Sequence, residues 1–271
     1  MTRMTLSLVL SMFIAVLVSY IITCAEAEYV TDGLISYWPL DDSTIEGKTV
    51  KDIFGKNNGT IIGNPKIVEG KVGQALEFDG ISGCVDCGGD ESLAPTDGVT
   101  IEAWVKVNSQ KDFSWKQTVA GCEDGPRGFV LRGLGQDKFL QMSAGNGAIW
   151  HDQDGSYCFY EGLELGTWYH VAGTVTANNG KIKLYVNAEQ CNAGNELGFD
   201  GNLAASTKPF TIGSLDLYPD RTFPGVIDEL RVYNRALTQN EIETNMRNTS
   251  SHAVNMAGKL AVTWGELKSD R

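Results

Sequence analysis

Short segments in which apolar and polar residues alternate recur along most of this 271-residue chain. In residues 181–187, Ile182, Leu184 and Val186 share one face of an extended strand, because successive side chains of a strand point to opposite faces. Residues 76–79 and 101–107 show the same period of two. The chain also has 31 glycines, enough for many tight turns. This pattern predicts an all-β fold.

Five of the β segments follow one another in a characteristic order. They are residues 33–42 (GLISYWPLDD), 76–80 (LEFDG), 101–106 (IEAWVK), 168–174 (WYHVAGT) and 225–237 (GVIDELRVYNRAL). In this order they resemble a laminin-G-like jellyroll domain of the concanavalin A-like lectin/glucanase type, over residues 28–246. The resemblance implies an antiparallel jellyroll sandwich of two sheets. It also implies a recognition module that is usually non-catalytic and calcium-dependent.

One short helix is expected after the last strand. Thr238 and Glu241 have the spacing of a capping box, and Ile242 and Met246 lie four residues apart on one helical face. We expect this helix to close one end of the sandwich. The two sheets are expected to pack around Trp104, Trp168, Ile182, Leu184 and Leu230, with His170 also in the core.

The first 27 residues have the features of a signal peptide. Arg3 precedes an almost wholly apolar run from Leu6 to Ile22, and Ala25 and Ala27 supply the small residues of a cleavage site. An uncleaved membrane anchor and lipidation at Cys24 are the alternatives. With cleavage after Ala27, residues 28–247 form the laminin-G-like domain. Residues 248–271 form a tail that is either weakly amphipathic or disordered. The protein is then secreted, on the cell surface or periplasmic, with no membrane insertion.

The charge and the cysteines restrict the partners further. The formal net charge is −12, and it stays −12 without residues 1–27, which carry one Arg and one Glu. Such a surface repels nucleic acid and anionic membranes. Loss of Cys24 leaves five cysteines, an odd number, and the pairing among Cys122, Cys158 and Cys191 stays open. Cys84 and Cys87 form only half of a zinc-binding motif.

A calcium site is expected where the chain ends meet. Asp228 shares strand parity with Leu230 and Val232, so we expect it to point inward, where a carboxylate needs a partner. Calcium prefers oxygen ligands, and the resemblance places calcium between the Asp after the first strand and the Asp of the last one. These are Asp41 and Asp228. Alternatively, Asp228 accepts backbone hydrogen bonds at a bulge.

Residues 148–160 are the candidate ligand surface. Trp150, His151, Asp152 and Tyr157 combine flat aromatic rings with polar groups, the mixture that sugar recognition requires. The alternative interpretation of Trp150 is a core residue, since large aromatic side chains are mostly structural.

The sequence offers no pair of acids for glycoside hydrolysis. Glucanases of this fold use alternate acids on one strand face, whereas Asp228 and Glu229 are adjacent and point to opposite faces. We therefore expect a non-enzymatic module that binds a carbohydrate or glycosylated surface. An adhesion or protein-interaction module, a divergent glycan hydrolase and a structural envelope protein are the alternatives.

Overall fold

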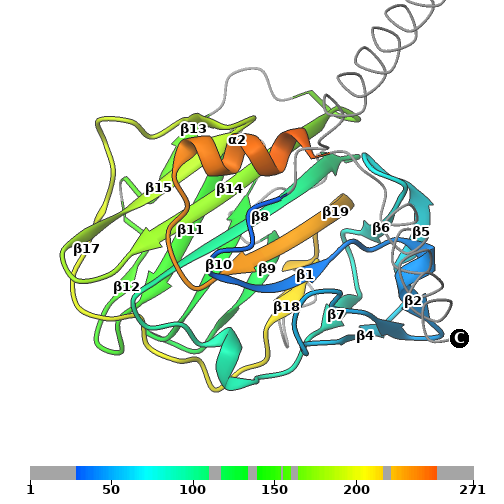
Figure 1. The fold of residues 1–271 in the computed structure, drawn as a ribbon, viewed down its shortest axis with the longest axis horizontal. Coiled ribbons are helices and arrows are strands. Elements are labelled where there is room, and N and C mark those ends of the chain that lie inside the picture. The colour runs from blue at the N-terminus through cyan, green and yellow to red at the C-terminus, as the bar shows by residue number, and fades with distance from the viewer. Residues whose placement is uncertain are drawn as a thin grey trace, which may run out of the picture.

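The computed structural model describes residues 29–109, 117–133, 139–153, 155–159, 164–215 and 221–248. In these residues, two antiparallel sheets face each other, and an α-helix lies against the outer side of one sheet (Figure 1). The predicted all-β jellyroll sandwich with one short helix is therefore confirmed. None of the helices in the described ranges is long and apolar enough to cross a membrane.

The first sheet, here called sheet A, holds both ends of the domain. Its strands run in the order β16 (Glu189–Gln190), β15 (Gly180–Val186), β14 (Trp168–Thr176), β8 (Gly98–Val107), β19 (Pro224–Tyr233), β6 (Gln74–Asp79) and β5 (Lys66–Glu69). In addition, β1 (Leu34–Trp38) pairs with β19, and β17 (Gly198–Phe199) pairs with β15. The pairing of β1 with β19 confirms that the first and last strands lie side by side.

The second sheet, sheet B, lies behind sheet A in Figure 1. Its order is β12 (Trp150–His151), β11 (Phe139–Gly145), β10 (Gly128–Gly133), β9 (Thr118–Glu123), β18 (Thr211–Ile212), β7 (Cys84–Asp86), β4 (Gly59–Ile62), β3 (Thr49–Val50) and β2 (Ile45–Glu46). The short strand β13 (Tyr157–Phe159) pairs with β11. Two 3₁₀ helices, Asp42–Thr44 and Glu91–Leu93, lie in connecting segments.

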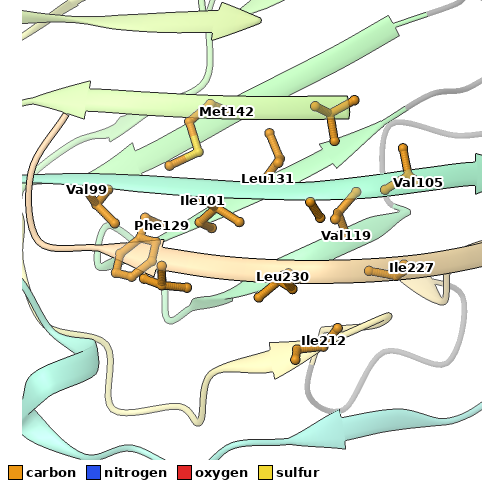
Figure 2. Packing of buried hydrophobic residues seen from close by; sticks show 14 of the residues in the cluster. Val99, Ile101, Val105, Val119, Phe129, Leu131, Met142, Ile212, Ile227 and Leu230 are labelled. Carbon is orange, nitrogen blue, oxygen red and sulfur yellow. The ribbon is translucent and has the colours of Figure 1, made fainter. Parts of the chain in front are cut away.

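The hydrophobic core fills the space between the sheets (Figure 2). Alternate residues of sheet A strands, such as Ile101 and Leu230, pack towards Val119, Leu131 and Met142 of sheet B. Ile182 and Leu184 belong to the same cluster, as predicted. Each large apolar side chain buried in this way contributes about 1.5–3 kcal/mol to folding.

Trp104 and Trp168 lie outside this core, so their prediction as core residues is wrong. Trp104 alternates with the core residues Ala103 and Val105 and is therefore on the outer face of sheet A. Its ring meets His170 edge-on at a centroid distance of 5.3 Å, so His170 is buried on that face as well. Trp168 is only half-buried. The period of two identifies the two faces of a strand but not which of them meets the other sheet.

Part of the outer face of sheet A is buried by helix α2 (Gln239–Arg247) and by the first described residues. A second apolar cluster includes Ala172, Tyr185 and Tyr233 of the sheet and Ile242 of the helix, and Tyr29 packs against it. Sheet A is thus covered on both sides over this region, which explains why its strands are apolar on both faces.

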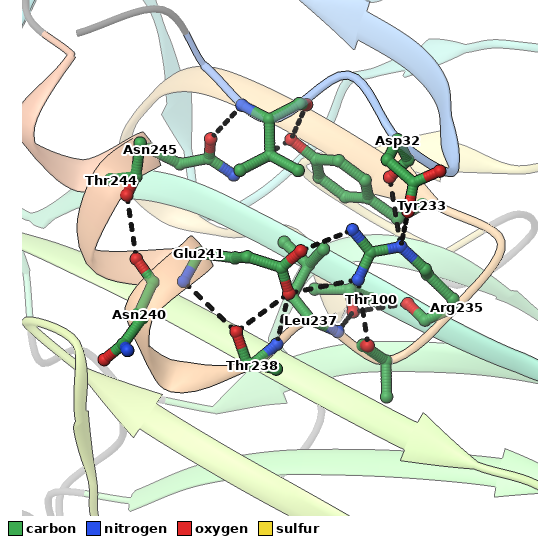
Figure 3. A network of polar contacts seen from close by, with 12 residues as sticks. Asp32, Thr100, Tyr233, Arg235, Leu237, Thr238, Asn240, Glu241, Thr244 and Asn245 are labelled. Carbon is green, nitrogen blue, oxygen red and sulfur yellow. Dashed lines mark hydrogen bonds and ion pairs between the residues drawn. The ribbon is translucent and has the colours of Figure 1, made fainter.

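Polar contacts hold the helix on the sheet (Figure 3). Thr238 and Glu241 form the predicted capping box, and Arg235 Nη2 donates to Glu241 Oε1 at 2.6 Å. Asn245 accepts from Val30 N at 2.8 Å and donates to Tyr233 Oη at 2.9 Å. The helix, the N-terminal segment and β19 are therefore connected through one buried amide.

A disulfide resolves the pairing that the sequence left open. Cys158 of β13 is bonded to Cys191, with a Cα–Cα distance of 5.7 Å. Cys87 and Cys122 are buried thiols, and burial raises the pKa of both. The bond links an edge of sheet B to the segment that follows β16 in sheet A.

Candidate functional site

The turn between β5 and β6 brings Asp41 and Asp228 to one place. Lys71 N and Val72 N donate to Asp228 Oδ2 at 2.7 and 2.9 Å. Gln74 N donates to Asp41 Oδ1 at 2.6 Å. Both carboxylates are buried, so the two predicted metal ligands lie against the same backbone turn.

A β-bulge sets the direction of Asp228. The register of β19 against β8 shifts between Asp228 and Arg231, and Glu229 adopts a left-handed φ of 55°. Asp228 therefore pairs with Trp104 on the outer face of sheet A, opposite to Leu230. The predicted burial of Asp228 is correct, but the predicted inward parity is wrong, because the extra residue of a bulge reverses the alternation.

The charge of Asp228 is poorly compensated by the protein. Burial raises the pKa of Asp228 to about 8, and the neighbouring carboxylates of Glu229 and Asp41 add to the rise, whereas the hydrogen bonds from Val72 and Lys71 lower it. Oδ1 of Asp228 is buried and has no hydrogen-bond partner in the described ranges. A cation beside this oxygen would remove the cost of the buried charge.

The backbone of the turn lies close to both carboxylates. A Cβ atom at Gly73 would lie 2.3 Å from Asp41 Oδ1, and one at Gly70 would lie 2.7 Å from Asp228 Oδ2, so the turn approaches the carboxylates through glycines. In the described ranges, no group of three or more His, Cys, Asp or Glu side chains is placed to hold a metal. Calcium would therefore need backbone carbonyls or water beyond Asp41 and Asp228.

A second candidate surface lies on the outer face of sheet B. Thr118, Arg132, Gln141 and Tyr157 stand opposite one another on β9, β10, β11 and β13. Residues paired across strands share one face of a sheet, and Arg132 and Gln141 alternate with core residues. The guanidinium carbon of Arg132 lies 5.9 Å from the centre of the Trp150 ring.

Polar contacts fix the side chains of this row. Glu123 Oε2 accepts from Arg132 Nη1 at 3.3 Å and from Arg221 Nη1 at 3.1 Å. Gln141 Nε2 donates to the backbone oxygen of Asp152 at 3.0 Å. The Ser143 hydroxyl is buried and has no hydrogen-bond partner in the described part of the chain. Thr118, Arg132 and Gln141 are buried, so the accessible part of this face consists of the half-buried Trp150 and Tyr157 and the exposed Asp152.

The structure brings together only part of the predicted ligand set. Trp150 and Tyr157 are half-buried beside the Arg132 row, and Asp152 is exposed at its margin. His151 is buried, with its ring 4.5 Å from that of Phe199. Because His151 pairs with the core residue Ala144, its side chain points to the face of the sheet opposite to the Arg132 row.

Sequence reasoning missed Arg132 and Gln141, which lie beside Trp150 and Tyr157. Arg132 and Gln141 come from strands that precede the aromatic segment, so a local search around residues 148–160 could not find them. The sequence does contain a pattern that could have identified them, because each is a polar residue that alternates with the apolar residues of a buried strand.

The chain belongs to the concanavalin A-like lectin/glucanases superfamily. Residues 79–243, more than half of the chain, match the sequence profile of this family. No curated protein sequence matches the chain.

Solved structures with a similar fold include binding domains and enzymes. Domain 4 of AbnA, a GH43 extracellular arabinanase from Geobacillus stearothermophilus solved with arabinotriose, has a TM-score of 0.61 and 24% identity, over 79% of this chain and 98% of that one. The binding domain of Paraclostridial Mosquitocidal Protein 1 has a TM-score of 0.59 and 18% identity, over 79% and 52%. A Trypanosoma rangeli sialidase in complex with sialic acid has a TM-score of 0.56 and 19% identity, over 80% and 33%.

Proposed function

We propose that this protein is an exported, non-catalytic carbohydrate-binding module. The observation that carries the proposal is the half-buried Trp150 ring beside the row of Arg132, Gln141 and Tyr157 on the outer face of sheet B. We call this surface the sheet B face, and it includes Asp152 at its margin.

The chemistry of the sheet B face suits a sugar. The flat ring of Trp150 can pack against the apolar C–H face of a pyranose or furanose. The exposed Asp152 supplies a planar acceptor for hydroxyl groups, and the buried Gln141 holds its backbone through a hydrogen bond. Because Glu123 and Gln141 hydrogen-bond to their neighbours, these polar groups are ordered before a ligand arrives, which reduces the entropic cost of binding.

The comparisons support a carbohydrate ligand. Domain 4 of AbnA, which aligns over 98% of its length, was solved with arabinotriose. This chain spans only 33% of the sialidase, so the activity of the sialidase is not carried over. Export is supported by the Cys158–Cys191 disulfide, since such bonds form in oxidising compartments.

The absence of catalysis is supported by the acids of the sheet B face. Glycosidases generally flank the scissile bond with two carboxyl groups, one of which donates a proton. Glu123 is held by two guanidinium groups, and Asp152 is exposed. This pair is better suited to holding a sugar than to cleaving it.

Calcium is the proposed structural cofactor. Asp41 and Asp228 would hold it against the turn between β5 and β6, and its charge would compensate the two buried carboxylates. The ion would fix the chain ends and this turn, with no part in chemistry.

Isothermal titration calorimetry with neutral and acidic oligosaccharides tests the sugar site. Trp150→Ala should weaken binding about tenfold or more, since a stacked aromatic ring is worth about 1–2 kcal/mol. Trp168→Ala is the matched control, because Trp168 is also half-buried but lies on sheet A. If Trp150→Ala keeps wild-type affinity, or if Trp168→Ala loses as much, the sheet B face is not the binding surface.

A further inference from the structure

A pocket lies where the ends of β5, β6, β8 and β19 meet. In Figure 1, β5 and β6 lie at the opposite side of the molecule from β12, the strand that carries Trp150. Its volume is about 390 Å³, within the range of small-molecule sites. Phe78 and Pro224 are part of its lining, and both are buried. Lys66, Glu77, Asp79 and Asn108 supply charged and amide groups.

Hydrogen bonds fix the polar walls and leave acceptors available. Asn108 Nδ2 donates to Glu77 Oε1 at 2.7 Å. Asp79 Oδ1 accepts from Ile81 N and Ser82 N, both at 2.8 Å. These contacts use one oxygen of each carboxylate, so each keeps a second oxygen as an acceptor. The carboxylates are therefore oriented, yet able to bind further hydroxyl groups.

The charge balance selects the class of ligand. Lys66 and Glu77 stand opposite each other on β5 and β6. One ammonium group thus faces two carboxylates, those of Glu77 and Asp79. An anionic sugar would meet net repulsion, whereas hydroxyl groups can donate to both carboxylates and accept from Lys66 and Asn108.

We propose that this pocket is a second saccharide site, specific for an uncharged sugar such as a neutral hexose or pentose. The proposal rests on the proposed carbohydrate-binding function. It adds a site on the opposite side of the sandwich, so one molecule could contact two sugar residues on different chains.

Two-dimensional NMR of the ¹⁵N-labelled mature protein tests the pocket residue by residue. The probes are D-galactose, D-glucose and L-arabinose as neutral sugars, with D-glucuronate as the anionic one. Neutral sugars should shift the amide signals of Glu77, Asn108 and Ser109, and D-glucuronate should bind there about tenfold more weakly or not at all. Repeating the titration on Trp150→Ala isolates the pocket from the sheet B face.

Asn108→Ala should lower the affinity of the pocket about five- to tenfold, because it removes a donor and releases Glu77. Asn202→Ala is the matched control, since Asn202 is an exposed asparagine whose amide also contacts an acid, Asp97. The Asn202→Ala variant should bind neutral sugars in the pocket with the affinity of the wild type. Retained amide spectra of both variants would show that folding is intact.

The outcomes separate this proposal from the proposed function. Shifts confined to Trp150, Tyr157 and Gln141 would overturn the pocket and keep the sheet B face. Equal binding of D-glucuronate and neutral sugars in the pocket would overturn the stated ligand class. If no sugar shifts any signal, both the pocket and the carbohydrate-binding function fail.

Discussion

Asp228 shows at the scale of one residue how local backbone geometry determines an electrostatic property. The bulge at Glu229 turns Asp228 to the outer face of sheet A, and the turn between β5 and β6 buries it there. Two backbone N–H groups bind Oδ2, and they leave Oδ1 without a partner in the described ranges. The result is a carboxyl group that is costly to ionise without a cation.

The pH dependence of stability tests this account. The folded-state pKa of Asp228 is raised to about 8 from 3.8, so the metal-free folded protein binds more protons than the unfolded chain between these values. The free energy of unfolding should therefore fall as pH rises from about 4 to 8 in chelator. Calcium binds the ionised form, so millimolar calcium should raise the melting temperature more at pH 8 than at pH 5. A calcium effect that is equal at both pH values would contradict this assignment.

Asp228→Asn separates the charge from the shape. The asparagine amide has nearly the size of the carboxylate but carries no charge, so the metal-free variant should be more stable than the wild type at pH 8 and insensitive to calcium. At a calcium level a hundredfold above its Kd, the wild type should gain about 2.7 kcal/mol, or roughly 5–10 °C. Asp79→Asn is the control, because Asp79 caps an exposed turn. If Asp228→Asn retains the full calcium effect, other residues hold the ion.

At the scale of elements, helix α2 is held by contacts from distant parts of the chain. Asn245 lies at the centre of these contacts, with bonds to Val30, Tyr233 and Glu102. It is fully buried, so each lost bond would leave a buried polar group without its partner.

Asn245→Ala should therefore lower the free energy of unfolding by about 2–4 kcal/mol, as urea denaturation followed by circular dichroism would measure. Asn240→Ala, on the exposed side of the same helix, should change it by less than about 0.5 kcal/mol. Similar values for the two variants would mean that the buried amide does not anchor the helix.

At the scale of the whole molecule, the repeating β pattern and the order of five segments were enough to predict the sandwich, and the capping box predicted its helix. The predictions that were wrong concern features that depend on tertiary structure. Trp104 and Trp168 alternate like core residues, but sheet A is also covered on its outer side. The bulge at Glu229 has no glycine to mark it.

The candidate sites were predictable only in part for the same reason. Asp41 and Asp228 were found because both end strands carry an acid, and the structure places them at one turn. Trp150 and Tyr157 were found from local composition. Arg132 and Gln141 meet them only through the register of β10, β11 and β13, which the sequence does not specify.

Native mass spectrometry of the mature protein with a mixture of neutral oligosaccharides tests the central claim most directly, because it reports binding and cleavage together. Binding without catalysis predicts protein masses increased by intact oligosaccharides, and no shortened sugars after prolonged incubation. Trp150→Ala should lose most of these complexes. The absence of any complex with the wild-type protein, or the appearance of shortened oligosaccharides that depend on one carboxylate, would contradict a non-catalytic carbohydrate-binding module.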